Sequence, residues 1–267
     1  MSQTGNLVAS VITVKGHTVQ EEFIRQSGLT DINSYPQWAR NILQATQEKK
    51  RQVVHHDVFA MMKEGRLPSR AMRNFLIAGW PVIEQFPQYM AVNLCKIRYG
   101  RSRGEDLARK YLLHNIRVEQ NHADHWVNWA TACGVARAEL LTVTAPIESL
   151  ALSHSCWHTC ERDSLATSMA ATNLAIEGAT GEWSTRVCAS TVYENTFDQD
   201  VRHKAMRWLN IHARYDDTHP WEALDIICTL IGNVAIPSYQ SLLELRVGQS
   251  YDYMTMSLDQ CLAQPKK

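Results

Sequence analysis

The segment Leu209–Trp221, LNIHARYDDTHPW, contains three side chains that can bind a metal ion: His212, Asp216 and His219. A helix turns by about 100° per residue, so Asp216 would lie about 40° from His212 and His219 about 20° away on its other side. Asp217 would point about 140° away. Because a buried carboxylate needs a compensating charge, this shared stripe predicts a metal site.

Two further segments contain side chains of the same kind. Glu119 and His122 in RVEQNHADHW have an E-x2-H spacing, which places both on one face of a helix and is typical of metal sites in helical bundles. Glu177 in NLAIEGATGEW is the only charged residue between Asp163 and Glu182. So apolar a segment is expected to be buried, and a buried carboxylate needs a partner.

Carboxylates and imidazoles together form the predicted ligand set. Its members are Glu119, His122, Glu177, His212, Asp216 and His219. Hard carboxylates with imidazoles, and no thiolate on the same faces, favour iron or manganese over structural zinc. Two divalent ions would nearly balance three carboxylates, and six ligands would leave open positions for a reaction with O₂. The alternative is a set of hydrogen-bonded core histidines and surface carboxylates.

Other polar residues invite a metal interpretation with less support. Glu84 in WPVIEQF could be an additional ligand or could cap a kink beside Pro81, and His125 flanks the expected face of His122. The run from His154 to Cys160 fits no standard zinc module, so we expect it to pack or to line a pocket.

The elements that must position these residues are predicted to be long helices. Apolar residues recur at three- and four-residue spacing, and no repeat or linker interrupts the chain. The expected helices cover 36–65, 68–99, 104–132, a less regular 146–160, 163–190, 198–231 and 237–263, with kinks at Pro81, Pro87 and Pro220. We therefore predict an all-α, single-domain bundle of six to seven long helices over residues 35–267, preceded by an irregular N-terminal arm, residues 1–34.

The composition excludes several classes of partner. The 27 basic and 27 acidic residues give a formal charge of zero, which argues against nucleic acid as the main partner. Seven scattered cysteines favour a reducing compartment, and no apolar stretch reaches the roughly 18 residues of a membrane span. With no signal peptide recognised, we expect a cytoplasmic protein.

Three motifs carry a resemblance to a known family: NIRVEQNHADHW, AATNLAIEGATGEWS and HARYDDTHPWEAL. They resemble the haem-oxygenase-like non-haem diiron oxidases, which have a TenA-like fold. Within that family they are most similar to the bacterial fatty-acid decarboxylases that form medium-chain terminal alkenes such as 1-undecene. The likeness extends through GWPVIEQFPQYMA and SYDYM, and covers most of the chain from Tyr35 onward.

The resemblance implies a function and an assignment of ligands. Glu119, His122 and His212 would hold one iron and act in catalysis, and Glu177, Asp216 and His219 would hold the second. The cofactor would be Fe(II), with two ions expected, and O₂ would be the co-substrate. A medium-chain fatty acid would lose a β-hydrogen and CO₂ to give a terminal alkene. An external electron donor and a homo-oligomer are compatible with this function.

Two alternatives stay open at the level of sequence. A related diiron oxidase acting on an amino acid or amine would need a charged pocket. A TenA-like, thiaminase-type hydrolase would need a cysteine nucleophile beside a carboxylate, for which Cys156, Cys160 and Cys188 are the candidates. A pure iron-storage role is weaker.

Overall fold

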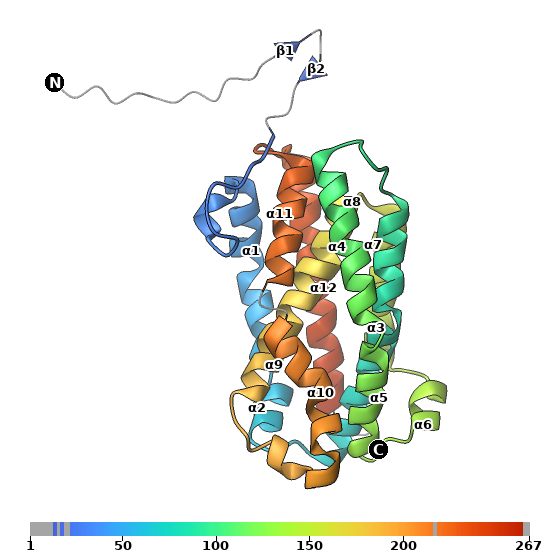
Figure 1. Ribbon diagram of the computed structural model, residues 1–267. Helices are drawn as coiled ribbons and strands as arrows, with labels where there is room; N and C mark the ends of the chain where they lie inside the picture. Colours follow the sequence, from blue (N-terminus) through green and yellow to red (C-terminus); the bar gives the residue numbers. More distant parts are fainter. Residues whose placement is uncertain (1–12, 15–16, 19–21, 216–217, 264–267) are drawn as a thin grey trace, which may run out of the picture.

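The computed structural model describes residues 13–14, 17–18, 22–215 and 218–263. Its helices form one elongated bundle, with α12 running through the middle of the view in Figure 1 and α6 lying at one side. The α-helices are α1 Gln37–Val54, α2 Asp57–Lys63, α3 Ser69–Cys95, α4 Arg103–Glu119, α5 His122–Ala132, α6 Arg137–Thr142, α7 Ile147–Arg162, α8 Leu165–Met169, α9 Glu177–Cys188, α10 Gln199–Tyr215, α11 His219–Ile231 and α12 Pro237–Leu262. The all-α, single-domain prediction is confirmed, but the described residues form twelve α-helices in place of six to seven, because several expected long helices are divided.

Shorter elements complete the described structure. They are the antiparallel strands β1 Thr13–Val14 and β2 His17–Thr18, the 3₁₀ turns η1 Ile32–Ser34 and η3 Glu194–Thr196, and the π-helical turn η2 Ala170–Ile176. The strand pair and η1 lie within residues 1–34, for which an irregular arm stays the prediction. No described helix combines the length and apolar character of a membrane span.

The expected helix 36–65 is divided into α1 and α2, and two further expected helices, which contain candidate ligands, are also divided. The segment 104–132 ends one helix at Glu119 and begins the next at His122. The segment 198–231 ends α10 at Tyr215 and begins α11 at His219. In Figure 1, α4 and α11 lie in the upper half of the bundle while α5 and α10 lie in the lower half. Both divisions therefore fall near the middle of the molecule.

Local chemistry explains where these helices begin. At α4, Ser102 caps the helix by accepting a hydrogen bond from the Glu105 amide over 3.2 Å. At α11, Pro220 occupies the first turn, where its missing amide proton costs no hydrogen bond. Proline thus opens a new helix here and does not kink a continuous one.

The fifth expected helix, residues 163–190, contains the π-helical turn η2. All seven of its residues are buried, and Glu177 follows it directly as the first residue of α9. A π turn inserts one extra residue per turn and is often found at functional sites. Here it sets the direction in which the Glu177 side chain leaves the helix.

Aromatic side chains fill the lower core around α5, α9 and α10. The cluster consists of Phe59, Phe75, Trp126, Trp129, Trp183 and Trp208, with ring centroids 4.3–5.9 Å apart between neighbours. Trp126 packs so tightly on α3 that a Cβ at Gly79 would come within 2.6 Å of its ring. Glycine is therefore needed for the α3–α5 contact, which holds α5 and its first residue, His122, in place.

Candidate metal centre

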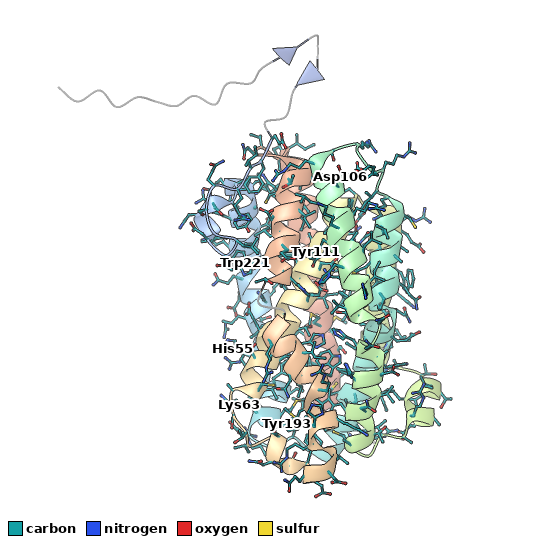
Figure 2. The ribbon with its side chains drawn as sticks, in the orientation of Figure 1. His55, Lys63, Asp106, Tyr111, Tyr193 and Trp221 are labelled. Atoms are coloured by element: carbon teal, nitrogen blue, oxygen red, sulfur yellow. The ribbon has the colours of Figure 1, made fainter. Side chains whose placement is uncertain are left out.

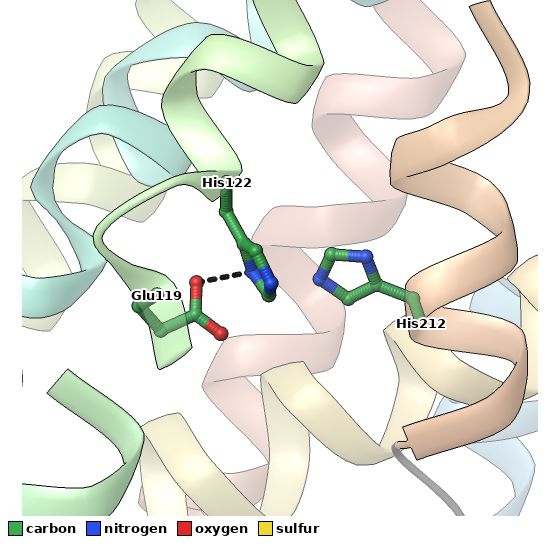
Figure 3. A group of neighbouring side chains, drawn as sticks. All are labelled: Glu119, His122 and His212. Atoms are coloured by element: carbon green, nitrogen blue, oxygen red, sulfur yellow. Dashed lines mark ion pairs between the residues drawn. The ribbon is translucent and has the colours of Figure 1, made fainter. Parts of the chain in front are cut away.

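Glu119 and His122 meet across the junction between α4 and α5. Glu119 is the last residue of α4 and His122 the first of α5, and Glu119 Oε2 lies 2.6 Å from His122 Nδ1 (Figure 3). The angles at this contact are not those of a hydrogen bond, so the buried Nδ1 has no hydrogen-bond partner among the described residues. Nδ1 and the carboxylate oxygen approach each other without forming a hydrogen bond. Both can donate an electron pair, so the two atoms could bind one metal ion between them.

His212 faces this pair from the last turn of α10. Its Nδ1 lies 2.8 Å from the Trp208 carbonyl oxygen, so Nδ1 carries the proton and donates it. The ring nitrogen Nε2 is then left as the electron-pair donor. Burial, together with the neighbouring His122 imidazole, holds the pKa of His212 well below its ordinary value. The imidazole is therefore neutral, as a metal ligand must be.

The three side chains form a compact group. One ligand atom from each of Glu119, His122 and His212 lies within 4.8 Å of the other two. Two ligands of a single ion at 2.0–2.2 Å are at most about 4.4 Å apart, so small side-chain movements bring all three to one metal. One carboxylate and two imidazoles with open positions fit the facial arrangement of non-haem iron sites. Within the described part of the chain, this is where three His, Cys, Asp or Glu side chains come close enough to hold a metal ion.

Glu177 lies near the group but bonds to other residues. The Tyr111 hydroxyl and Asn173 Nδ2 both approach its Oε2, at 3.1 Å and 3.3 Å. Burial, and then the charge of Glu119, raise the pKa of Glu177 to about 8. Without a metal ion this carboxyl group is thus largely protonated at neutral pH, and a nearby cation would be needed to ionise it.

His219 begins α11 on the far side of Tyr111. Its ring is partly buried, with centroids 6.3 Å from the Tyr111 ring and 6.5 Å from the His114 ring. Burial lowers the pKa of His219, while the charge of Glu119 opposes that shift. The structure therefore places Glu177 and His219 close enough to Glu119 for its charge to shift their pKa values, but outside the close group of three. Asp216, the remaining predicted ligand, and its neighbour Asp217 lie outside the described residues.

The weaker sequence candidates lie elsewhere. Glu84 is exposed, and the His125 ring is 6.4 Å from the His122 ring without joining the group. The run His154–Cys160 belongs to helix α7, where Cys156 and Cys160 are buried. The two cysteines pack in the core, whereas His154 and His158 are exposed, so packing explains only part of this run.

Three residues that the sequence analysis did not select support the ligands. Tyr111 and Asn173 bond to Glu177, and Trp208 accepts from His212 while stacking on its ring at 3.7 Å. Asn173 and Trp208 each precede their ligand by four residues, which is one helical turn. A polar or aromatic residue at that spacing is the signal that could have found Asn173 and Trp208, whereas no local signal marks Tyr111.

Residues 73–233, more than half of the chain, match a family described as iron-containing redox enzymes. The chain belongs to this family. It is also 50% identical to a TenA homolog from Pseudomonas syringae pv. tomato, with a TM-score of 0.89 over 91% of this chain and 99% of that one.

More distant structures share the fold alone. A TenA homologue from Pyrococcus furiosus is 11% identical with a TM-score of 0.67, over 84% of this chain and 99% of that one. A domain of unknown function with a heme oxygenase-like fold, from Shewanella denitrificans, is 11% identical with a TM-score of 0.65, over 83% of this chain and 90% of that one. A comparison with curated proteins gave no match.

Proposed function

We propose that the protein is an O₂-dependent non-haem iron oxidase that converts a medium-chain fatty acid into a terminal alkene and CO₂. The observation that carries the proposal is the group formed by Glu119, His122 and His212 in a chain of the iron-containing redox family. The motifs quoted above favour the decarboxylase over other members of that family.

The overall reaction balances with an external electron donor. Loss of the β-hydrogen and of CO₂ from the acid releases two electrons and two protons, whereas reduction of O₂ to two water molecules takes up four of each. Two electrons and two protons must therefore come from a one-electron carrier or another soluble reductant. Fe(II) in this site would supply the activation of O₂.

The protein itself has two tasks in this reaction, which are to hold the irons and to exclude water. Glu119, His122 and His212 hold the first iron, and Glu177, Asp216 and His219 are proposed to hold a second. The neutral His212 imidazole needs no proton loss before it binds. The aromatic cluster around Trp208 excludes water on the α10 side of the site.

A charged groove lies next to two of the residues that follow candidate ligands, and it argues against a simple amine as the substrate. It has a volume of about 1180 Å³ between α1, α9 and α11, and its wall includes Gly178 and Pro220, the residues that follow Glu177 and His219. Basic residues in its lining outnumber acidic ones by four to two. The basic residues are Arg40, Lys50, Arg51 and Arg186, and the acidic ones are Glu48 and Glu182. Lys50 pairs with Glu182 and Arg51 with Glu48, so the net positive charge of the groove comes from Arg40 and Arg186. This charge attracts a carboxylate and repels an ammonium group, and it leaves an amino acid, which carries both, as the open alternative.

The test is an aerobic reaction of iron-loaded protein with a chemical reductant and medium-chain fatty acids, of about eight to fourteen carbons. The series covers a range of affinities, because each buried CH₂ adds about 0.8 kcal/mol. We expect a terminal alkene one carbon shorter than the acid, and CO₂, both dependent on iron and O₂. The matched control is His122→Ala. Folded, iron-loaded protein that consumes no O₂ with any acid would contradict the proposal.

A TenA-like hydrolase is the second candidate, favoured by the 50% identity to a TenA homolog. It would require a reactive thiol, yet burial raises the pKa of Cys156, Cys160 and Cys188. None of the three belongs to the metal-binding group. Hydrolysis of thiamin by metal-free protein, lost when one of these cysteines is replaced by serine, would decide for this candidate.

A further inference from the structure

Asn115 is a buried asparagine whose side chain has no hydrogen-bond partner among the described residues. Its relative exposure is 1%, and both Nδ2 and Oδ1 are buried and unpaired. The other fully buried asparagines are paired. Asn93 donates to Cys160 Sγ and accepts from Ser168, and Asn173 donates to Glu177 and accepts from Thr172. Among the fully buried asparagines that the structure describes, Asn115 therefore differs in that its side chain has no hydrogen-bond partner.

An unpaired buried amide is unfavourable, because its donor and acceptor lose their bonds to water and gain none. Leucine has nearly the same branched shape and would avoid this loss at position 115. The chain therefore keeps a residue that does not help the free protein to fold. Such a residue is best explained by a group that binds to it.

The position of Asn115 indicates where that group would bind. Residues four apart share a helix face, so Asn115 lies between Tyr111 and Glu119 on α4. Tyr111 projects from α4 toward α11 (Figure 2), where its hydroxyl approaches Glu177 Oε2 and the His219 carbonyl oxygen. The amide of Asn115 thus belongs to the same buried face as the candidate metal ligands.

We propose that Asn115 binds the carboxyl group of the substrate. This inference rests on the proposed function and names the residue that selects the head group. The acid is a carboxylate in water, and burial beside Asn115 favours its neutral form, which takes up a proton on binding. The Nδ2 amide group donates to one carboxyl oxygen, and Oδ1 accepts from the carboxyl O–H. A side chain with one donor and one acceptor pairs with such a group at both of its atoms. A lysine or arginine would offer donors only.

The experiment compares Asn115→Leu and Asn115→Ala with Asn93→Leu, the same change at an equally buried but paired asparagine. Thermal unfolding is followed first, on metal-free protein. We expect Asn93→Leu to lower Tm by several degrees, because two bonded groups lose their partner. Asn115→Leu should leave Tm unchanged or raise it.

Binding is then measured by calorimetry without O₂, on iron-loaded protein with dodecanoic acid and its methyl ester as probes. In wild type the acid should bind more tightly than the ester, which lacks the O–H donor. Both Asn115 variants should bind the acid about tenfold more weakly, as expected for lost hydrogen bonds to a buried polar group. Their affinity for the ester should change less than about twofold, since only one bond is then at stake and water can replace it.

Each result decides. A Tm loss in Asn115→Leu as large as that in Asn93→Leu would make Asn115 a structural residue and overturn the inference, and so would unchanged acid binding or equal weakening of acid and ester. If Asn115→Leu fails to fold, the binding measurement is made on Asn115→Ala alone. Wild-type protein that binds the acid through Asn115 but forms no alkene would refute the proposed reaction alone. Alkene formation with unaltered binding by the variants would refute the inference alone, and absence of acid binding in wild type would refute both.

Discussion

The imidazole of His212 stacks on the indole of Trp208, with ring centroids 3.7 Å apart, and bonds to the Trp208 carbonyl through Nδ1. These two contacts fix both the ring plane and the tautomer. Because residue 208 lies one helical turn before residue 212, the contacts form within α10 itself. The direction of Nε2 is therefore already set before a metal ion arrives.

His212→Ala should lower the affinity for iron more than about 100-fold, since even supporting residues around a metal change it by 10–100-fold. His203→Ala is the matched control, because His203 is exposed on the same helix and, nine residues away, faces the opposite side. Iron per chain, measured after reconstitution and gel filtration, checks the difference. Equal losses in the two variants would mean that iron binds elsewhere.

His219→Ala should keep the fold and the first iron but lose the second iron and the O₂-dependent reaction. His219 lies outside the close group of three and is the first residue of α11, so its loss leaves the first site and the rest of that helix in place. The control is His114→Ala, because His114 is exposed beside His219. Iron counting alongside a thermal melt distinguishes the outcomes, and wild-type iron content would remove His219 from the ligand set.

Glu177 makes the stability of metal-free protein depend on pH. Its pKa in the folded state is about 8, against an ordinary value of 4.5, so the folded chain keeps a proton that the unfolded chain has lost. This contribution is fully present below pH 4.5 and is lost as the pH rises through about 8. Between pH 5 and pH 9, wild type should lose on the order of a few kcal/mol more stability than Glu177→Gln.

Denaturant unfolding of both proteins at the two pH values, with a chelator present, measures this effect. Glu161→Gln, at an exposed position, should show the pH dependence of wild type. Excess Fe(II) should reduce the difference for wild type, because the ion stabilises the ionised carboxylate. Parallel pH profiles for wild type and Glu177→Gln would contradict the burial of this carboxyl group.

Gly79→Ala should destabilise the fold by about 1–3 kcal/mol, because the added Cβ would stand 2.6 Å from Cζ2 of the fully buried Trp126. Gly28→Ala is the control, since a Cβ there would meet nothing within 4 Å. Chemical denaturation checks both. A neutral Gly79→Ala would show that α3 and α5 can move apart freely.

Helix periodicity was enough to predict the all-α bundle, and the apolar surroundings of Glu177 were enough to predict its burial, which is 7% relative exposure. The break after Glu119 could not be predicted, because RVEQNHADHW contains neither glycine nor proline and every residue in it tolerates a helix. The E-x2-H pair therefore meets at a junction and not along one helix face. Pro220 did signal an interruption, but its role as the opening turn of α11 depends on where α10 ends.

The break between α10 and α11 changes the argument for the shared stripe of His212, Asp216 and His219. A common phase requires one continuous helix, whereas α10 ends at Tyr215 and α11 begins at His219. The approach of His212 and His219 to Glu119 follows from the packing of four helices, and packing across long sequence separations is not encoded in local periodicity.

Four of the five described candidate ligands lie at or next to a helix end: Glu119 ends α4, His122 and His219 begin α5 and α11, and His212 is in the last turn of α10. Glu177 lies within a continuous helical segment, where η2 passes into α9. Terminal turns open far more often than helix centres, because few hydrogen bonds must break. An ion can thus reach the core of the bundle through local fraying while the long helices stay folded. Bound ions would join these four helix ends, and amide hydrogen exchange would slow at the two junctions while the middle of α12 exchanged as before.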